Sequence, residues 1–119
     1  MAETYKNYID GEWVASETGE TFDVINPAQN DEVIGEFQAS SSADAERAIE
    51  AAADAEDDWA NTPGPARGEI LRETAKNLEA RKDELAETLT EEEGKPLSSA
   101  TGEVQRAIDI FYYYAGKAV

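Results

Sequence analysis

The chain has 119 residues, of which 40% are apolar, and its 27 acidic and 10 basic side chains give a formal net charge of -17. This charge argues against nucleic acid and anionic membrane surfaces as partners, and the absence of cysteine and histidine excludes disulfides, thiol nucleophiles and the commonest general base. The sequence shows neither an apolar run near the ~20 residues of a membrane span nor a signal-peptide core, so we expect a cytoplasmic protein.

The acidic residues are spread over the whole chain rather than gathered in a tail. Such a distribution is typical of a halophilic protein, because dense carboxylates stay hydrated at high salt and screening removes most of their repulsion. An acidic module that binds a basic protein is the alternative. The even spread favours the halophilic interpretation.

The first 38 residues are expected to form a small β-meander. Asp10-Gly11 stands between two runs of aromatic and β-branched residues, which is the pattern of a type I′ hairpin turn. Further strands are expected at 21–25 and 33–37, and Asn26-Pro27 ends the first of these.

Three to four amphipathic helices should follow. Ser41 and Asp44 form an approximate capping pair, and the helix behind them should end near Asn61, ahead of two prolines. Its alanines and Ile49 recur at helical spacing and should form one apolar face. A second apolar stripe is interrupted at 80–82, where we expect a bend or a break, and the last helix should start near Leu97.

The fold class is therefore α+β, and residues 1–119 show no internal domain boundary. The chain ends in the apolar and aromatic run YYYAGKAV. This ending indicates a chain that stops in mid-fold, with a frayed C-terminal helix as the alternative.

The segment EEEGKP, residues 91–96, allows three interpretations. A phosphate-binding loop would need glycine and a hydroxyl residue where the chain has Leu89 and Pro96. Three adjacent carboxylates on a helix point about 100° apart and cannot all reach one metal ion. We therefore expect a helix end capped by Gly94, at which one carboxylate at most binds a cation.

Other candidates have simple structural explanations. The aromatic run 111–114 should divide between core packing and a partner surface, because its rings point in different directions on a helix. Trp13 and Trp59 are expected to be core or interface anchors. Arg106 has an ion pair with Glu103 as its simplest role. From the residues alone, no catalytic constellation emerges.

In order, the segments NYIDGEW, TFDVINPAQNDEVIGEF, DDWA, EEEGKP and FYYYAGKA resemble the N-terminal part of the NAD(P)-dependent aldehyde dehydrogenase superfamily. The resemblance covers essentially all 119 residues but only the opening of a longer family chain. It implies that this chain is the truncated N-terminal portion of the cofactor-domain region in a larger α/β fold.

The resemblance implies oxidation of an aldehyde to a carboxylic acid with NAD or NADP. In the family a cysteine thiolate attacks the carbonyl, a glutamate activates water, and an asparagine with a backbone N–H stabilises the oxyanion. These residues and the cofactor-binding turn lie later in family chains. The chain is thus expected to hold no catalytic or cofactor-binding residue, and to need the rest of the enzyme or further subunits.

Two sites follow from matching family positions. Some family members hold a monovalent cation, and here the backbone carbonyls of Val24 and Ile25 with the acid of Glu92 would bind Na⁺ or K⁺, which prefer oxygen ligands. The last helix lines the aldehyde entrance in the family, and Gly102 and Arg106 would face it. An arginine there would favour an anionic semialdehyde.

Two alternatives to an enzyme fragment stay open: a free-standing acidic binding or regulatory module, and a non-functional remnant. The coding DNA after Val119 separates the enzyme fragment from these two alternatives. Continuation into a cofactor turn and a catalytic cysteine supports the enzyme.

We predict that the purified 119-residue chain is poorly stable in low salt. Its helical stripes would normally pack against later parts of the fold, and a domain of this size buries limited surface. Thermal unfolding followed by circular dichroism should show a broad transition. A sharp cooperative transition in low salt would contradict this prediction.

Overall fold

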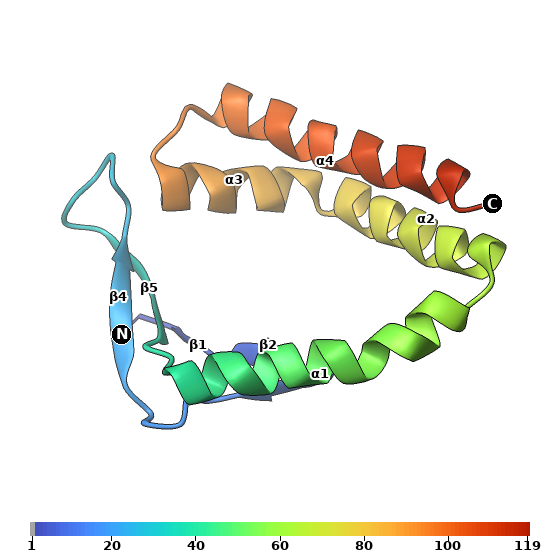
Figure 1. Ribbon diagram of the computed structural model, residues 1–119. Helices are drawn as coiled ribbons and strands as arrows, with labels where there is room; N and C mark the ends of the chain where they lie inside the picture. Colours follow the sequence, from blue (N-terminus) through green and yellow to red (C-terminus); the bar gives the residue numbers. More distant parts are fainter. Residues whose placement is uncertain (1) are drawn as a thin grey trace. The chain divides into compact units, whose positions relative to one another are not determined.

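The structure, a computed structural model, describes residues 2–119 (Figure 1). The chain divides into two compact units, the first ending at Ala60 and the second beginning at Asn61. Among the described residues, unit 1 holds all the strands and the first helix, and unit 2 holds three helices. The α+β class is confirmed, and the absence of an internal domain boundary stays a prediction.

The described part of unit 1, from residue 2 onward, contains five short strands: β1 (Thr4–Tyr5), β2 (Asn7–Ile9), β3 (Glu12–Val14), β4 (Thr21–Ile25) and β5 (Val33–Gln38). β2 and β3 form a separate antiparallel hairpin, and the other strands form a sheet in the order β1-β5-β4.

Their connectivity differs from the expected meander, because β1 pairs in parallel with β5. Only Lys6 separates β1 from β2, and one residue cannot make the tight turn that an antiparallel pair of consecutive strands requires. β1 therefore pairs with a strand from later in the chain.

The hairpin turn is as predicted. Asp10 and Gly11 have φ values of 52° and 77°, the two positive angles of a type I′ turn. On the two strands that the turn joins, the ring centroids of Tyr8 and Trp13 lie 4.9 Å apart. Trp13 is 66% exposed, so it is not an anchor of this chain's own core.

Helix α1 (Ser42–Asn61) starts at the predicted cap and ends at the predicted residue. The Ser41 backbone N–H donates to Asp44 Oδ2 over 2.8 Å, and the Glu17 backbone N–H donates to Asp44 Oδ1 over 2.9 Å. These donors hold the pKa of Asp44 below its usual value, despite its burial. Asp44 thus joins the β3–β4 loop to the start of α1.

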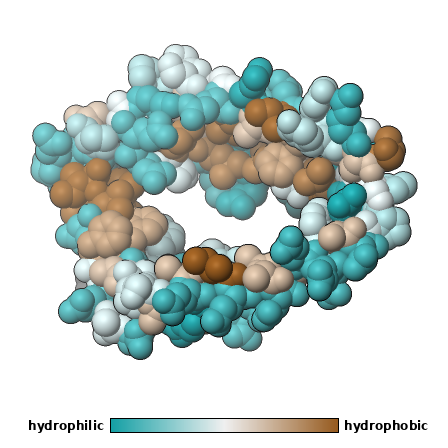
Figure 2. Space-filling view, viewed as in Figure 1, coloured by the Kyte–Doolittle hydropathy of each residue, from teal (hydrophilic) through white to brown (hydrophobic). Residues whose placement is uncertain are grey.

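Most of α1 is exposed. Asp44 is its buried residue, whereas Ile49, on the expected apolar face, is 67% exposed. Hydrophilic side chains dominate the visible surface of this helix in Figure 2. The alanine-rich stripe exists as predicted, but the described residues of unit 1 leave it largely uncovered.

Unit 2 consists of α2 (Gly64–Ala80), α3 (Lys82–Glu93) and α4 (Leu97–Lys117). The predicted break falls at Arg81, between α2 and α3, and α4 runs back along both helices (Figure 1). Buried side chains from α3 and α4 form the core, with partly buried neighbours against it: Ala86, Ala100, Val104 and Ile108, then Leu78, Leu85, Leu89 and Tyr112.

The start of α2 and the end of α4 approach each other at backbone distance. A Cβ atom on Gly68 would lie 2.6 Å from the backbone oxygen of Ala115, and one on Gly64 would lie 1.9 Å from that of Ala118. Any side chain there would push the two helices apart. Among residues 2–119, none of the helices is both long and apolar enough to cross a membrane.

We predict that Gly68→Ala destabilises the chain by about 1–3 kcal/mol, because the added methyl group overpacks a contact with rigid backbone. Gly102→Ala is the matched control, since nothing lies within 4 Å of its Cβ position. It should stabilise the chain by about 0.5–1 kcal/mol through helix propensity. Both are measured by thermal unfolding in concentrated KCl. Stabilisation by both substitutions would contradict the close approach.

Candidate functional site

The EEEGKP segment is a helix end, as predicted. α3 stops at Glu93, and Gly94 adopts a left-handed conformation with φ 69°. The Gly94 backbone N–H donates to the carbonyl of Thr90 over 2.8 Å. Glycine suits this position because it carries no Cβ to oppose a positive φ.

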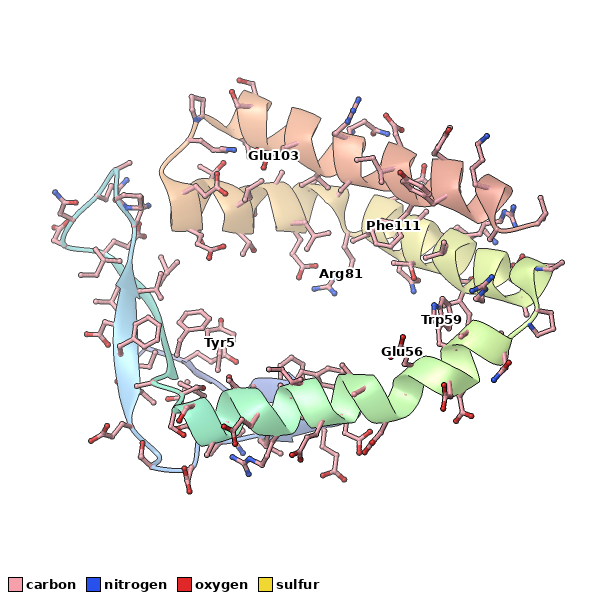
Figure 3. The ribbon with its side chains drawn as sticks, in the orientation of Figure 1. Tyr5, Glu56, Trp59, Arg81, Glu103 and Phe111 are labelled. Atoms are coloured by element: carbon pink, nitrogen blue, oxygen red, sulfur yellow. The ribbon has the colours of Figure 1, made fainter. Side chains whose placement is uncertain are left out.

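Lys95 ties this helix end to α4. Its Nζ lies 2.8 Å from Glu93 Oε2 and also pairs with Glu103, which Figure 3 labels on α4. The carboxylates of Glu103 and Glu93 raise the pKa of Lys95 above its ordinary value. This cation offsets the unfavourable placement of Glu93 at a helix C-terminus.

The three residues expected to hold a cation fall in different units. Val24 and Ile25 lie on β4 in unit 1, where the pairing with β5 is irregular, and Glu92 is exposed in the last turn of α3 in unit 2. In the described part of the chain, no group of three or more acidic side chains is placed to hold a metal ion. The expected site needs a single acid with two carbonyls, and it stays a prediction.

The outer face of α4 carries the other candidate residues. Five side chains at helical spacing line a shallow hollow of about 600 Å³: Arg106, Asp109, Ile110, Tyr113 and Tyr114. Gly102 lies one turn before Arg106, in open space. The structure thus places both residues of the predicted aldehyde entrance on one helix, and their role there stays a prediction.

The simplest role expected for Arg106, an ion pair with Glu103, does not occur, and Glu103 pairs with Lys95 instead. Asp109, on the other side of Arg106, accepts a hydrogen bond from Gln105 Nε2 over 2.9 Å. Within residues 2–119 the Arg106 side chain has no ion-pair partner.

The aromatic run divides as predicted between core and surface. Tyr112 packs against the core of unit 2, and its hydroxyl donates to Glu79 Oε2 over 2.6 Å. That hydrogen bond, with burial, raises the pKa of Tyr112. Tyr113 and Tyr114 are 59% and 57% exposed, and their rings meet edge to face.

Sequence reasoning missed Asp109, Ile110, Tyr113 and Tyr114 as neighbours of Arg106. Their positions, three, four, seven and eight residues after it, place them on its helix face. This spacing is visible in the sequence. The set mixes an acid, an aliphatic residue and two tyrosines, however, so it stands out neither as an apolar nor as a charged helix face.

A sequence model of the aldehyde dehydrogenase family matches residues 13–119. The chain belongs to this family. The resemblance expected from the ordered segments is therefore confirmed.

Relatives in the aldehyde dehydrogenase family include semialdehyde dehydrogenases. The chain is 58% identical over 118 residues to an alpha-ketoglutarate semialdehyde dehydrogenase of Haloferax volcanii, covering 99% of this chain and 24% of that protein. It is 44% identical over 111 residues to a malonate-semialdehyde dehydrogenase of Bacillus pumilus, covering 93% and 23%. The chain thus spans about a quarter of the length of these relatives.

Solved aldehyde dehydrogenases share the fold of this segment. An NAD-dependent aldehyde dehydrogenase from Sinorhizobium meliloti matches with a TM-score of 0.92 and 32% identity, over 98% of this chain and 24% of its own. A betaine aldehyde dehydrogenase from Staphylococcus aureus in complex with NAD⁺ matches with a TM-score of 0.89 and 35% identity, over 94% and 23%. The arrangement of strands and helices is that of the family's N-terminal region.

Proposed function

We propose that this chain forms the N-terminal part of an NAD(P)-dependent aldehyde dehydrogenase that oxidises a carboxylate-bearing semialdehyde to the corresponding acid. The observation that carries the proposal is the 58% identity, over almost the whole chain, with the alpha-ketoglutarate semialdehyde dehydrogenase of Haloferax volcanii. A malonate-semialdehyde dehydrogenase among the relatives supports the same substrate class.

The outer face of α4 would supply the charge recognition. Arg106 is exposed and lines the hollow together with Tyr113 and Tyr114. A guanidinium group offers a planar fork of donors that fits a carboxylate, and the aromatic rings offer apolar contact to a carbon chain. Gly102, one turn earlier, leaves room beside the fork.

This chain would not catalyse the reaction alone. Its sequence contains no cysteine, so the thiolate nucleophile would come from the rest of the enzyme or from another subunit. NAD(P)⁺ accepts the hydride in this chemistry. The sequence lacks a glycine-rich strand-to-helix turn that would hold a dinucleotide, and we assign no cofactor contact to this chain.

The working environment would be a cytoplasm of high salt. The formal charge of -17 and the 58% identity to a protein of the halophile Haloferax volcanii support this inference. Screening would then lower the repulsion among the carboxylates.

A chimera tests the proposed function. This chain replaces the matching quarter of the Haloferax volcanii enzyme, and NAD(P)H formation is followed with α-ketoglutarate semialdehyde. We expect activity comparable to that of the parent enzyme. A folded chimera that is inactive beside an active parent would contradict the proposal.

Arg106 should control selectivity in this chimera. A charge-assisted hydrogen bond contributes about 1.5–3 kcal/mol, so Arg106→Ala should lower kcat/KM for the semialdehyde roughly 10- to 100-fold. Arg106→Lys keeps the charge without the fork and should fall in between. An uncharged aldehyde of similar length is the control substrate and should be little affected. Equal losses for both aldehydes would rule out charge recognition by Arg106.

Glu92 should make the activity of the chimera dependent on Na⁺ or K⁺. Glu92→Ala removes the one side-chain ligand and should raise the ion concentration that gives half-maximal activity, whereas Glu92→Asp should retain most of the response. Glu91→Ala is the matched control, because its side chain points about 100° away on α3. An unchanged ion response in Glu92→Ala would overturn this assignment.

A further inference from the structure

We propose that Gln105 and Lys95 are positioning residues that hold the two carboxylates nearest to Arg106 on α4, and thereby keep its guanidinium free for the substrate. The inference rests on the proposed function, because it explains how the anion-binding group of that site stays available. It adds a specificity-determining role for Gln105, which is neutral, and one for Lys95, which lies outside α4.

Competition for Arg106 is built into α4. Helix neighbours three or four positions apart lie close enough to form ion pairs. At three positions Arg106 is flanked by Glu103 and Asp109, and at four positions by Gly102 and Ile110, which carry no charge. Only the two carboxylates could occupy the fork from within the helix.

Glu103 is held from outside α4. It pairs with Lys95 in the loop after α3, and the same ammonium lies 2.8 Å from Glu93. The Lys95 side chain is only 24% exposed. Solvent and salt therefore screen its ion pair with Glu103 less than they screen a pair between fully exposed side chains. The α3–α4 connection thus keeps Glu103 occupied.

Asp109 is held by a relay that begins on α3. Lys82 Nζ donates to Gln105 Oε1 over 2.7 Å, and Gln105 Nε2 donates to Asp109 Oδ1 over 2.9 Å. An ammonium group can only donate, so it fixes which end of the amide faces it. The amide NH₂ is then directed to Asp109. A neutral side chain therefore carries the influence of the Lys82 cation to the rim of the hollow.

The relay matters because Asp109 lines the same hollow as Arg106. Released from Gln105, its carboxylate would be free to pair with the guanidinium and would compete with a substrate carboxylate for the same donors. The substrate would then bind only to the fraction of molecules in which Arg106 is open. An uncharged aldehyde would not sense this competition.

Gln105→Leu in the chimera tests the inference, since leucine keeps similar bulk but removes both polar atoms. In this variant Asp109 would be free to pair with Arg106. Because that ion pair would be exposed and weak, it should raise the KM for α-ketoglutarate semialdehyde only about two- to fivefold. We expect kcat, and the KM for an uncharged aldehyde, to stay unchanged. Adding Asp109→Asn should restore the parent KM, because the competing charge is gone.

Two outcomes would overturn the inference. If Gln105→Leu raises KM equally for both aldehydes, or if Asp109→Asn does not restore it, Gln105 has a merely structural role. Arg106→Ala distinguishes failure of this inference from failure of the proposed function. If it changes charge selectivity while Gln105→Leu does not, the inference alone fails, and if Arg106→Ala has no effect, the proposed role of this face fails with it.

Discussion

The packing of α4 against α2 and α3 is the constraint on which unit 2 depends. Small residues allow it, because Gly68 admits the backbone of Ala115 and Ala100 is fully buried. Ile108 is fully buried in the same core as Ala100. Once this face of α4 is buried, helical periodicity leaves the opposite face, with Arg106 and the two exposed tyrosines, open to a partner or substrate.

Excess acid shapes how the few cations are used. On the helices, several basic side chains pair with a carboxylate three residues away, as Arg72 does with Glu69 and Lys76 with Glu73. The Glu73 carboxylate raises the pKa of Lys76, and Lys76 lowers that of Glu73. Such exposed pairs contribute little to stability, because solvent screens the two charges. Among residues 2–119, Arg106 has no carboxylate partner, and the two acids three positions from it, Glu103 and Asp109, each interact with another side chain.

Local chemistry made much of the fold predictable. The Asp10-Gly11 turn, the cap at Ser41 and the helix end at Gly94 each depend on a few adjacent residues, and each occurs where the sequence indicates. The parallel pairing of β1 with β5 was not predictable in this way, because it joins segments far apart in the chain. The exposure of Ile49 was not predictable for another reason: an apolar stripe in a sequence does not show which part of the protein covers it.

The site was predictable only in part. Gly102 and Arg106 came from family positions, but the contacts that free Arg106 involve partners on other elements. Lys95 and Lys82 reach α4 from the ends of α3, and no local pattern reveals which carboxylate each one holds. Gln105 was overlooked because a neutral surface residue carries no obvious signal, although its place four residues before Asp109 permits the hydrogen bond.

Equilibrium binding of α-ketoglutarate to the chimera most directly tests whether α4 presents a free Arg106 to anionic compounds. This dianion is the product expected from α-ketoglutarate semialdehyde, and its binding requires no turnover. Calorimetry should show binding to the chimera that weakens about tenfold or more in Arg106→Ala, the loss expected for one charge-assisted hydrogen bond. An equal Kd in the two proteins would contradict the central claim.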